Sequence, residues 1–185
     1  MSLTRACLSL LACVLAACGG SGWSPKEDEA AKQETAENRS VAETIARFKT
    51  ADPGMQRFFD EAQGYAVFPT VGKGGLGIGG AHGAGEVYEK GKLVGYSTLT
   101  QLTIGLQLGG QAYSEIIFFK DARALEDFRR GNFELGAQAS AVAVTAGASA
   151  DAAYDGGVAI FTHVKGGLMY EASVGGQKFS FEPSR

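Results

Sequence analysis

Residues 64–80 read GYAVFPTVGKGGLGIGG, and this stretch decides the fold because the spacing of apolar residues changes here. Before Gly64 the apolar residues recur with the period of a helix, whereas after it they alternate as in strands. Glycines interleave with the apolar residues, which is typical of strands that bend or approach another backbone closely. The stretch therefore predicts that a helical region ends near Gly64 and that a curved sheet begins there.

Two helices are predicted upstream of this point. Val41, Ile45 and Phe48 lie at i, i+4 and i+7, so they share one face of the first helix. The pair Asp52-Pro53 supplies an N-cap and a first-turn proline for the second helix. Gly64 is predicted to end that helix in the left-handed conformation. Its buried face is predicted to consist of Met55, Phe58, Phe59 and Ala62.

Strands dominate the rest of the chain. A turn is predicted at Lys90-Gly91, and one further helix is predicted between Asp121 and Gly131. The last three strands are expected to form a closing antiparallel meander. The fold class is therefore α+β, with a curled, barrel- or sandwich-like antiparallel β-sheet, N-terminal helices and one helix between strands. Strands are predicted at 65–69, 76–89 (a strand pair or one long bent strand), 92–98, 99–108, 111–120, 137–150, 158–164, 168–174 and 178–181.

The first residues have the layout of a secretory signal, with Arg5 before an apolar stretch and small residues before Cys18. The run Leu15-Ala16-Ala17-Cys18 resembles the lipobox of bacterial lipoproteins, in which the cysteine thiol is lipidated and becomes the first mature residue. The alternatives are an ordinary signal with a coincidental cysteine and an uncleaved anchor. The predicted organisation is 1–17 signal peptide, 18–26 lipidated flexible linker, 27–63 N-terminal helical region and 64–185 β-rich core, with 27–185 as one domain.

Cysteine usage and charge agree with an envelope protein. Cys7 and Cys13 would leave with the signal, so the mature domain would carry no free thiol. Loss of Arg5 would leave 16 Lys and Arg against 20 Asp and Glu, a net charge of −4, which disfavours nucleic acid as a partner. Gly19 after the cysteine resembles the pattern of outer-membrane sorting. The predicted location is the bacterial cell envelope, lipid-anchored at the outer membrane, on its periplasmic or surface face.

No catalytic residue, cofactor or metal ligand is predicted. Gly75, Gly77 and Gly80 match the dinucleotide fingerprint by letter, but no helix follows them. His82 and His163 are the only histidines, and polar surface positions explain them better than a metal pair does. The chain has no G-x-S-x-G elbow.

An extended run of polar residues follows the predicted strands. The simpler interpretation is the solvated face of a half-buried sheet, and the functional alternative is the polar lining of a groove for a lipid head group. Glu115 is expected at an edge or rim, although a buried acid with a shifted pKa is the alternative. The run consists of Gln101, Thr103, Gln107, Gln111, Tyr113 and Glu115.

Cations near the helical aromatics suggest membrane contact. Arg47, Lys49 and Arg57 lie on or between the two early helices, close to phenylalanines, as in a basic amphipathic surface. In the alternative interpretation the aromatics fill the core and the cations are simply exposed. Together with Lys73, these three are the candidate lipid-binding residues.

The chain from about Val41 to Glu182 resembles the SYLF domain family, also called the Ysc84-like family. The resemblance implies a lipid-binding module, because eukaryotic members bind phosphoinositides and act in membrane and actin dynamics, and many bacterial members are lipoproteins. Tyr96 and Glu171 depart from the family pattern, and the region before the core is acidic here. The matching stretches are 64–69, 73–80, 105–111, 117–119, 124–128, 135–141 and 165–168.

The sequence thus predicts a membrane-anchored lipoprotein whose domain binds lipid or a membrane surface without catalysis. Its predicted partners are membrane lipid through the Cys18 acyl anchor and a phospholipid or other lipid ligand. The alternative is a structural envelope lipoprotein that docks a protein partner.

Overall fold

The structure, a computed structural model, describes residues 39–137, 139–166 and 174–184, with the backbone alone for 76–78 and 103–109. The predicted signal, Cys18 and linker lie outside these residues, as do residues 168–173 of one predicted strand. Within the described ranges, no helix is both long enough and apolar enough to cross a membrane.

The predicted helical region is present before the sheet. One helix covers residues 39–51, and it is followed by η1 (Pro53–Met55) and α2 (Gln56–Glu61). Asp52 is the N-cap, as predicted, and its carboxylate accepts a hydrogen bond from the Gly54 amide at 3.0 Å. The predicted apolar faces are confirmed in part: Val41, Phe48, Met55 and Phe58 are buried, whereas the remaining predicted members are half-buried, namely Ile45, Phe59 and Ala62.

The role predicted for Gly64 is wrong. α2 ends at Glu61, its C-cap Ala62 has an extended backbone, and Gly64 is not among the residues with positive φ. Gly64 instead opens the first strand, where a Cβ would collide with the Tyr88 carbonyl oxygen. A glycine is therefore needed here for close backbone approach rather than for a left-handed turn.

Two long strands, β1 (Gly64–Glu89) and β2 (Lys92–Phe119), replace five shorter predicted strands. The predicted turn joins them, with φ of 47° at Lys90 and 76° at Gly91. Register shifts occur at three places along this antiparallel pair, including one between Phe68 and Val71. Such bulges bend a strand without ending it, so the breaks in the sequence pattern mark bends.

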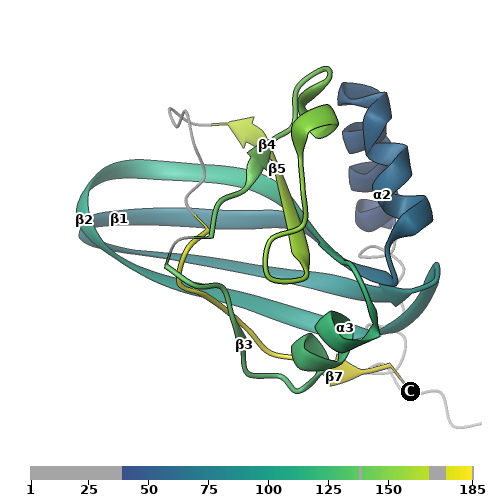
Figure 1. Ribbon diagram of the computed structural model, residues 1–185. Coiled ribbons are helices and arrows are strands. Elements are labelled where there is room, and N and C mark those ends of the chain that lie inside the picture. Colours follow the sequence, from purple (N-terminus) through teal and green to yellow (C-terminus); the bar gives the residue numbers. More distant parts are fainter. Residues whose placement is uncertain (1–38, 138, 167–173, 185) are drawn as a thin grey trace, which may run out of the picture.

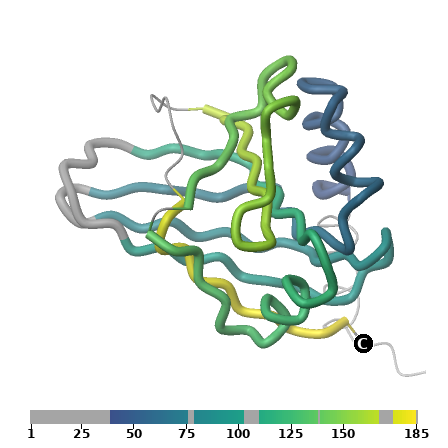
Figure 2. The backbone as a smooth tube through the Cα atoms, viewed as in Figure 1, coloured from purple at the N-terminus to yellow at the C-terminus, as the bar shows by residue number. Residues whose placement is uncertain are grey.

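β1 folds back so that its two halves lie side by side, flanked by the two halves of β2 (Figure 2). The approach is close, because a Cβ on Gly83 would lie 2.9 Å from the Thr70 carbonyl oxygen. At the base of the fold the Lys90 amide donates to the Gln63 carbonyl at 3.1 Å. One hairpin thus supplies four adjacent segments of the sheet.

Shorter strands extend this sheet, and the described residues contribute seven strands to it in total (Figure 1). The α+β class is confirmed. The predicted closing meander stays a prediction, because most of its middle strand lies outside the described residues; its first and last strands, β5 and β6, pair with opposite ends of β2. β4 runs parallel to β5, so the sheet is mixed. The shorter strands are β3 (Phe133–Glu134), β4 (Val142–Ala143), β5 (Val158–Gly166), β6 (Gln177–Phe179) and β7 (Glu182–Pro183).

The long strand predicted at 137–150 is also wrong. Only β4 is extended there, and η2 (Ala148–Asp151) follows Gly147, whose φ is 82°. Small side chains offer little cross-strand contact, so this segment crosses the sheet edge as loop instead of pairing along its length.

The sheet separates two apolar cores. The outer core lies under the N-terminal helices and is rich in aromatic side chains, among them Phe58, Phe118 and Phe161. The inner core lies within the curl and is covered by α3 (Ala122–Arg129), which contributes Leu125 and Phe128 as predicted. Figure 1 shows these helical elements on different sides of the sheet.

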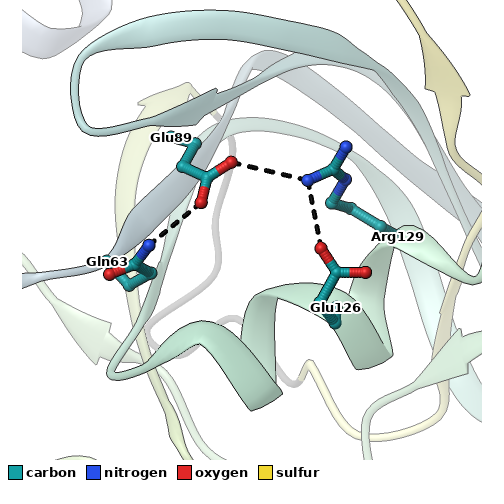
Figure 3. A network of polar contacts seen from close by, with 4 residues as sticks. All are labelled: Gln63, Glu89, Glu126 and Arg129. Atoms are coloured by element: carbon teal, nitrogen blue, oxygen red, sulfur yellow. Dashed lines mark hydrogen bonds and ion pairs between the residues drawn. The ribbon is translucent and has the colours of Figure 1, made fainter.

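A polar network fastens α3 to the end of β1 (Figure 3). Glu89 accepts from the Gln63 amide at 2.9 Å and pairs with Arg129 at 3.4 Å. Arg129 also contacts Glu126 at 3.1 Å. These groups are partly exposed, so the network fixes orientation more than it adds stability.

Candidate functional site

The four candidate lipid-binding cations do not form one surface. Arg57 is bound to the protein itself, because its guanidinium donates to the carbonyl oxygens of Ser149, Ala150 and Ala152. It thereby ties α2 to η2. Lys73 lies on the inner side of the sheet and is buried. Arg57 is exposed but bound to η2, and Lys73 is buried, so neither joins Arg47 and Lys49 on the first helix.

Lys49 and Arg47 remain on the first helix, where they face different neighbours. The Lys49 ammonium lies over the Phe59 ring, 4.4 Å from its centroid. Arg47 acts instead on Lys165 at the end of β5: burial lowers the pKa of Lys165, and the charge of Arg47 lowers it further, while Glu43 opposes the shift. Two cations therefore gather at one place on the outer face.

The sequence did not identify Lys165 as a functional residue, because it follows the end of the strand predicted at 158–164; β5 in fact extends to Gly166. In the structure its ammonium donates to the Thr70 hydroxyl of β1 at 2.7 Å. Strand pairing brings these residues together across β2, and local sequence carries no signal of that.

Thr70 also lines a cleft on the outer face with a volume of about 340 Å³. The cleft lies between the start of the first helix and the folded-back hairpin. Its walls include apolar surface from Val41, Pro69 and Ala84. The other lining residues are Ser40, Thr70, Gly85, Glu86, Tyr96, Ser97 and Thr98.

One end of the cleft is acidic. Glu86 is buried there and accepts a hydrogen bond from the Tyr88 hydroxyl. Burial raises the pKa of Tyr88, and the Glu86 carboxylate raises it further, so this hydroxyl stays protonated as a donor. The Tyr88 ring stacks on Tyr65 with centroids 5.1 Å apart.

The inner core contains a buried polar cluster formed by Lys73, Tyr113, Glu115 and Gln177. The Gln177 amide donates to the Tyr113 hydroxyl and to the Glu115 carboxylate, both at 3.1 Å. These contacts tie β6 to β2. The predicted solvated face is therefore wrong for Tyr113 and Glu115, and also for Gln101, which is buried and donates to the Gly175 carbonyl at 2.8 Å.

Glu115 is fully buried rather than at a rim. Burial raises its pKa to about 8, although the hydrogen bond from Gln177 and the positive charge of Lys73 oppose the shift. Burial likewise lowers the pKa of Lys73, and Glu115 opposes that change. Near neutral pH the carboxyl is thus mostly protonated, which avoids an isolated buried charge.

Together the bent hairpin sheet, the outer helices and the cleft define an α+β domain with a ligand-sized hollow beside paired cations. Residues 100–184 match the family model Ysc84, described as "Las17-binding protein actin regulator", so this part of the chain is similar to that family. The resemblance predicted from the sequence is confirmed. Beta cell expansion factor A from Aeromonas veronii is 29% identical over 143 residues, which cover 76% of this chain and 54% of that protein. The chain thus spans about half the length of this relative.

Proposed function

We propose that this protein binds anionic membrane lipid without catalysis, at the outer face of its sheet. The observation that carries the proposal is the gathering of Arg47 and Lys165 beside Thr70 on the outer face, where the charge of Arg47 lowers the pKa of Lys165 against the opposing effect of Glu43, and where a bound anion would offset the repulsion. The match of residues 100–184 to the Ysc84 family model supports it.

The proposal includes a lipid anchor at Cys18 and a location in the cell envelope. Lipidation contributes about 0.8 kcal/mol for each buried methylene, so two or more acyl chains hold a protein stably. A cation near an anionic surface contributes only about 1 kcal/mol. Arg47 and Lys165 would therefore orient an already tethered domain rather than hold it.

Orientation matters because the predicted mature chain is acidic overall. A net charge of −4 repels an anionic surface on average. The domain would approach such a surface with the Arg47 and Lys165 side first, since that side carries the gathered positive charge.

The test is sedimentation of residues 18–185 carrying Cys18→Ser with vesicles of phosphatidylglycerol and phosphatidylcholine, or of phosphatidylcholine alone. We expect binding to the anionic vesicles and weaker binding at high salt. The double variant Arg47→Ala/Lys165→Ala should bind roughly 10- to 30-fold more weakly. Each cation contributes about 1 kcal/mol of binding free energy, so the pair contributes about 2 kcal/mol.

The matched control is Lys90→Ala/Lys92→Ala, which removes the same charge at the hairpin turn. Equal losses in the two double variants would contradict the proposal. If the protein sedimented equally with both kinds of vesicle, and only when an envelope protein had co-purified with it, the alternative function of docking a protein partner would be favoured.

A further inference from the structure

We infer that the outer cleft takes one acyl chain of an anionic phospholipid, whose phosphate lies against Lys165 and Arg47. The inference rests on the proposed function and names the ligand of that face. It is carried by two observations: a largely apolar hollow of about 340 Å³, and a residue, Thr70, that both lines it and binds Lys165.

The size of the cleft selects the ligand. Small-molecule sites have volumes of roughly 300–1,000 Å³, so this cleft is at the narrow end of the range. A slender chain fits such a space better than both tails of a phospholipid do. Val41, Pro69 and Ala84 supply aliphatic walls for it.

The charged residues determine which way the acyl chain lies in the cleft. Lys165 reaches the Thr70 end through a bond of 2.7 Å to the Thr70 hydroxyl, and Arg47 adds its charge there. Thr70 approaches Gly83 on the second half of β1, whereas Glu86 lies three residues further along that half. At about 3.3 Å per residue the two ends are roughly 10 Å apart.

This separation keeps the phosphate away from the one carboxylate of the cleft lining. At the opposite end of the cleft, the Glu86 carboxylate accepts a hydrogen bond from the Tyr88 hydroxyl. A phosphate at the Thr70 end would meet the Lys165 ammonium with the charge of Arg47 close by, where two cations outnumber the one carboxylate, Glu43, that acts on Lys165. The acyl chain would run from there past Ala84 toward the other end. Reversing the ligand would place the anion against Glu86, which is unfavourable.

Calorimetric titration with alkyl phosphates of six to twelve carbons, below their micelle concentrations, tests the inference on residues 18–185 carrying Cys18→Ser. Each added methylene that leaves water should tighten binding about fourfold until the cleft is full. Alkyl phosphocholines of the same length should bind more weakly, because their cationic group faces Lys165.

Ala84→Phe should fill the cleft, and Ala84 is solvent-exposed, so the larger ring does not overpack the core. We expect this variant to lose the dependence on chain length while it still sediments with anionic vesicles. Ala122→Phe, at an exposed position on α3 outside the cleft lining, is the matched control and should behave as the parent.

An affinity that does not change with chain length, or one that Ala84→Phe leaves intact, would overturn the inference. If the protein did not sediment with anionic vesicles but its affinity for alkyl phosphates still rose with chain length, the proposed function would be contradicted and the acyl-chain inference would be supported. The two claims are thus tested separately.

Discussion

The two faces of the sheet differ in whether their charged groups are exposed or buried. On the outer face the N-terminal helices leave a cleft uncovered, and cations gather beside it at the surface. On the inner face α3 and the crossing loops close over Glu115 and Lys73, which are buried among apolar side chains. The comparison suggests that ligand chemistry belongs to the incompletely covered face, whereas buried charge on the covered face controls stability.

The largest expected effect is on the outer aromatic core. Phe118 is fully buried and packs against Phe58, Phe59 and Phe161 with ring centroids 4.8–5.7 Å apart. Phe118→Ala should lower the free energy of unfolding by about 3–5 kcal/mol, measured by chemical denaturation, because it leaves a large cavity. The control is Phe181→Ala at a partly buried inner site. A smaller loss at Phe118 than at Phe181 would show that the helices do not depend on this core.

The second effect concerns pH and the inner face. Burial raises the pKa of Glu115 to about 8 in the folded protein, whereas in the unfolded chain it returns to its ordinary value of 4.5. The folded state therefore keeps the Glu115 proton to higher pH than the unfolded chain does. The resulting stabilisation is complete below about pH 4.5 and is lost as the pH rises to about 8. Glu115→Gln should remove this loss, which amounts to a few kcal/mol at about 1.4 kcal/mol per pKa unit.

Unfolding free energies of both proteins at pH 4 and pH 9 test this expectation. We expect the variant to be the more stable at pH 9 and the two to differ little at pH 4. Equal pH slopes would mean that Glu115 is ionised in the folded protein. Lys73→Met provides a second check, because removal of its charge should raise the pKa of Glu115 further and extend the loss of stability to higher pH.

A smaller effect is expected at Asp52, which joins the helical layer to η2. Burial opposes its ionisation, but hydrogen bonds from Ser149, Gly54 and Gly147 outweigh burial and lower its pKa. Its carboxylate accepts from the Ser149 amide at 2.7 Å. Asp52→Ala should cost about 1–2 kcal/mol at neutral pH, as loss of an N-cap does.

The sign of its pH dependence is opposite to that of Glu115. A lowered pKa stabilises the fold at pH values above the usual pKa of Asp. That contribution is lost as the pH falls from there through the lowered pKa of the folded state. Thermal unfolding of parent and variant should therefore converge in acid. A constant difference down to pH 2 would contradict the assigned ionisation.

The smallest effect is expected for Arg57→Ala. Its guanidinium bonds to carbonyl oxygens at an exposed site, so loss of about 1 kcal/mol of stability is expected. Vesicle sedimentation should not change, because Arg57 is bound to η2. A binding loss equal to that of Arg47→Ala/Lys165→Ala would return Arg57 to the lipid-binding surface.

Local signals in the sequence predicted much of the fold. Helical spacing at Val41 and Phe48, the Asp52 cap and the Lys90-Gly91 turn depend only on neighbouring residues, and each is confirmed. Pattern breaks were mistaken for strand ends, because a bulge and a chain reversal interrupt alternation in the same way. The paired halves of β1 thus could not be read from spacing.

The site was less predictable because it depends on contacts between distant residues. Lys165 and Thr70 are 95 positions apart, and Gln177 reaches Glu115 across 62 positions. Alternation showed that Tyr113 and Glu115 share a face, but it could not show which face is covered. Coverage by α3 and β6 decides that, and it follows only from the three-dimensional arrangement.

The most direct test of the account is lysine footprinting by acetylation and mass spectrometry, with anionic or neutral vesicles present. The account predicts that anionic vesicles slow acetylation of Lys165 several-fold, while Lys178 on β6 and Lys90 in the hairpin turn react as before. Unchanged reactivity at Lys165, or stronger protection of Lys178 than of Lys165, would contradict it.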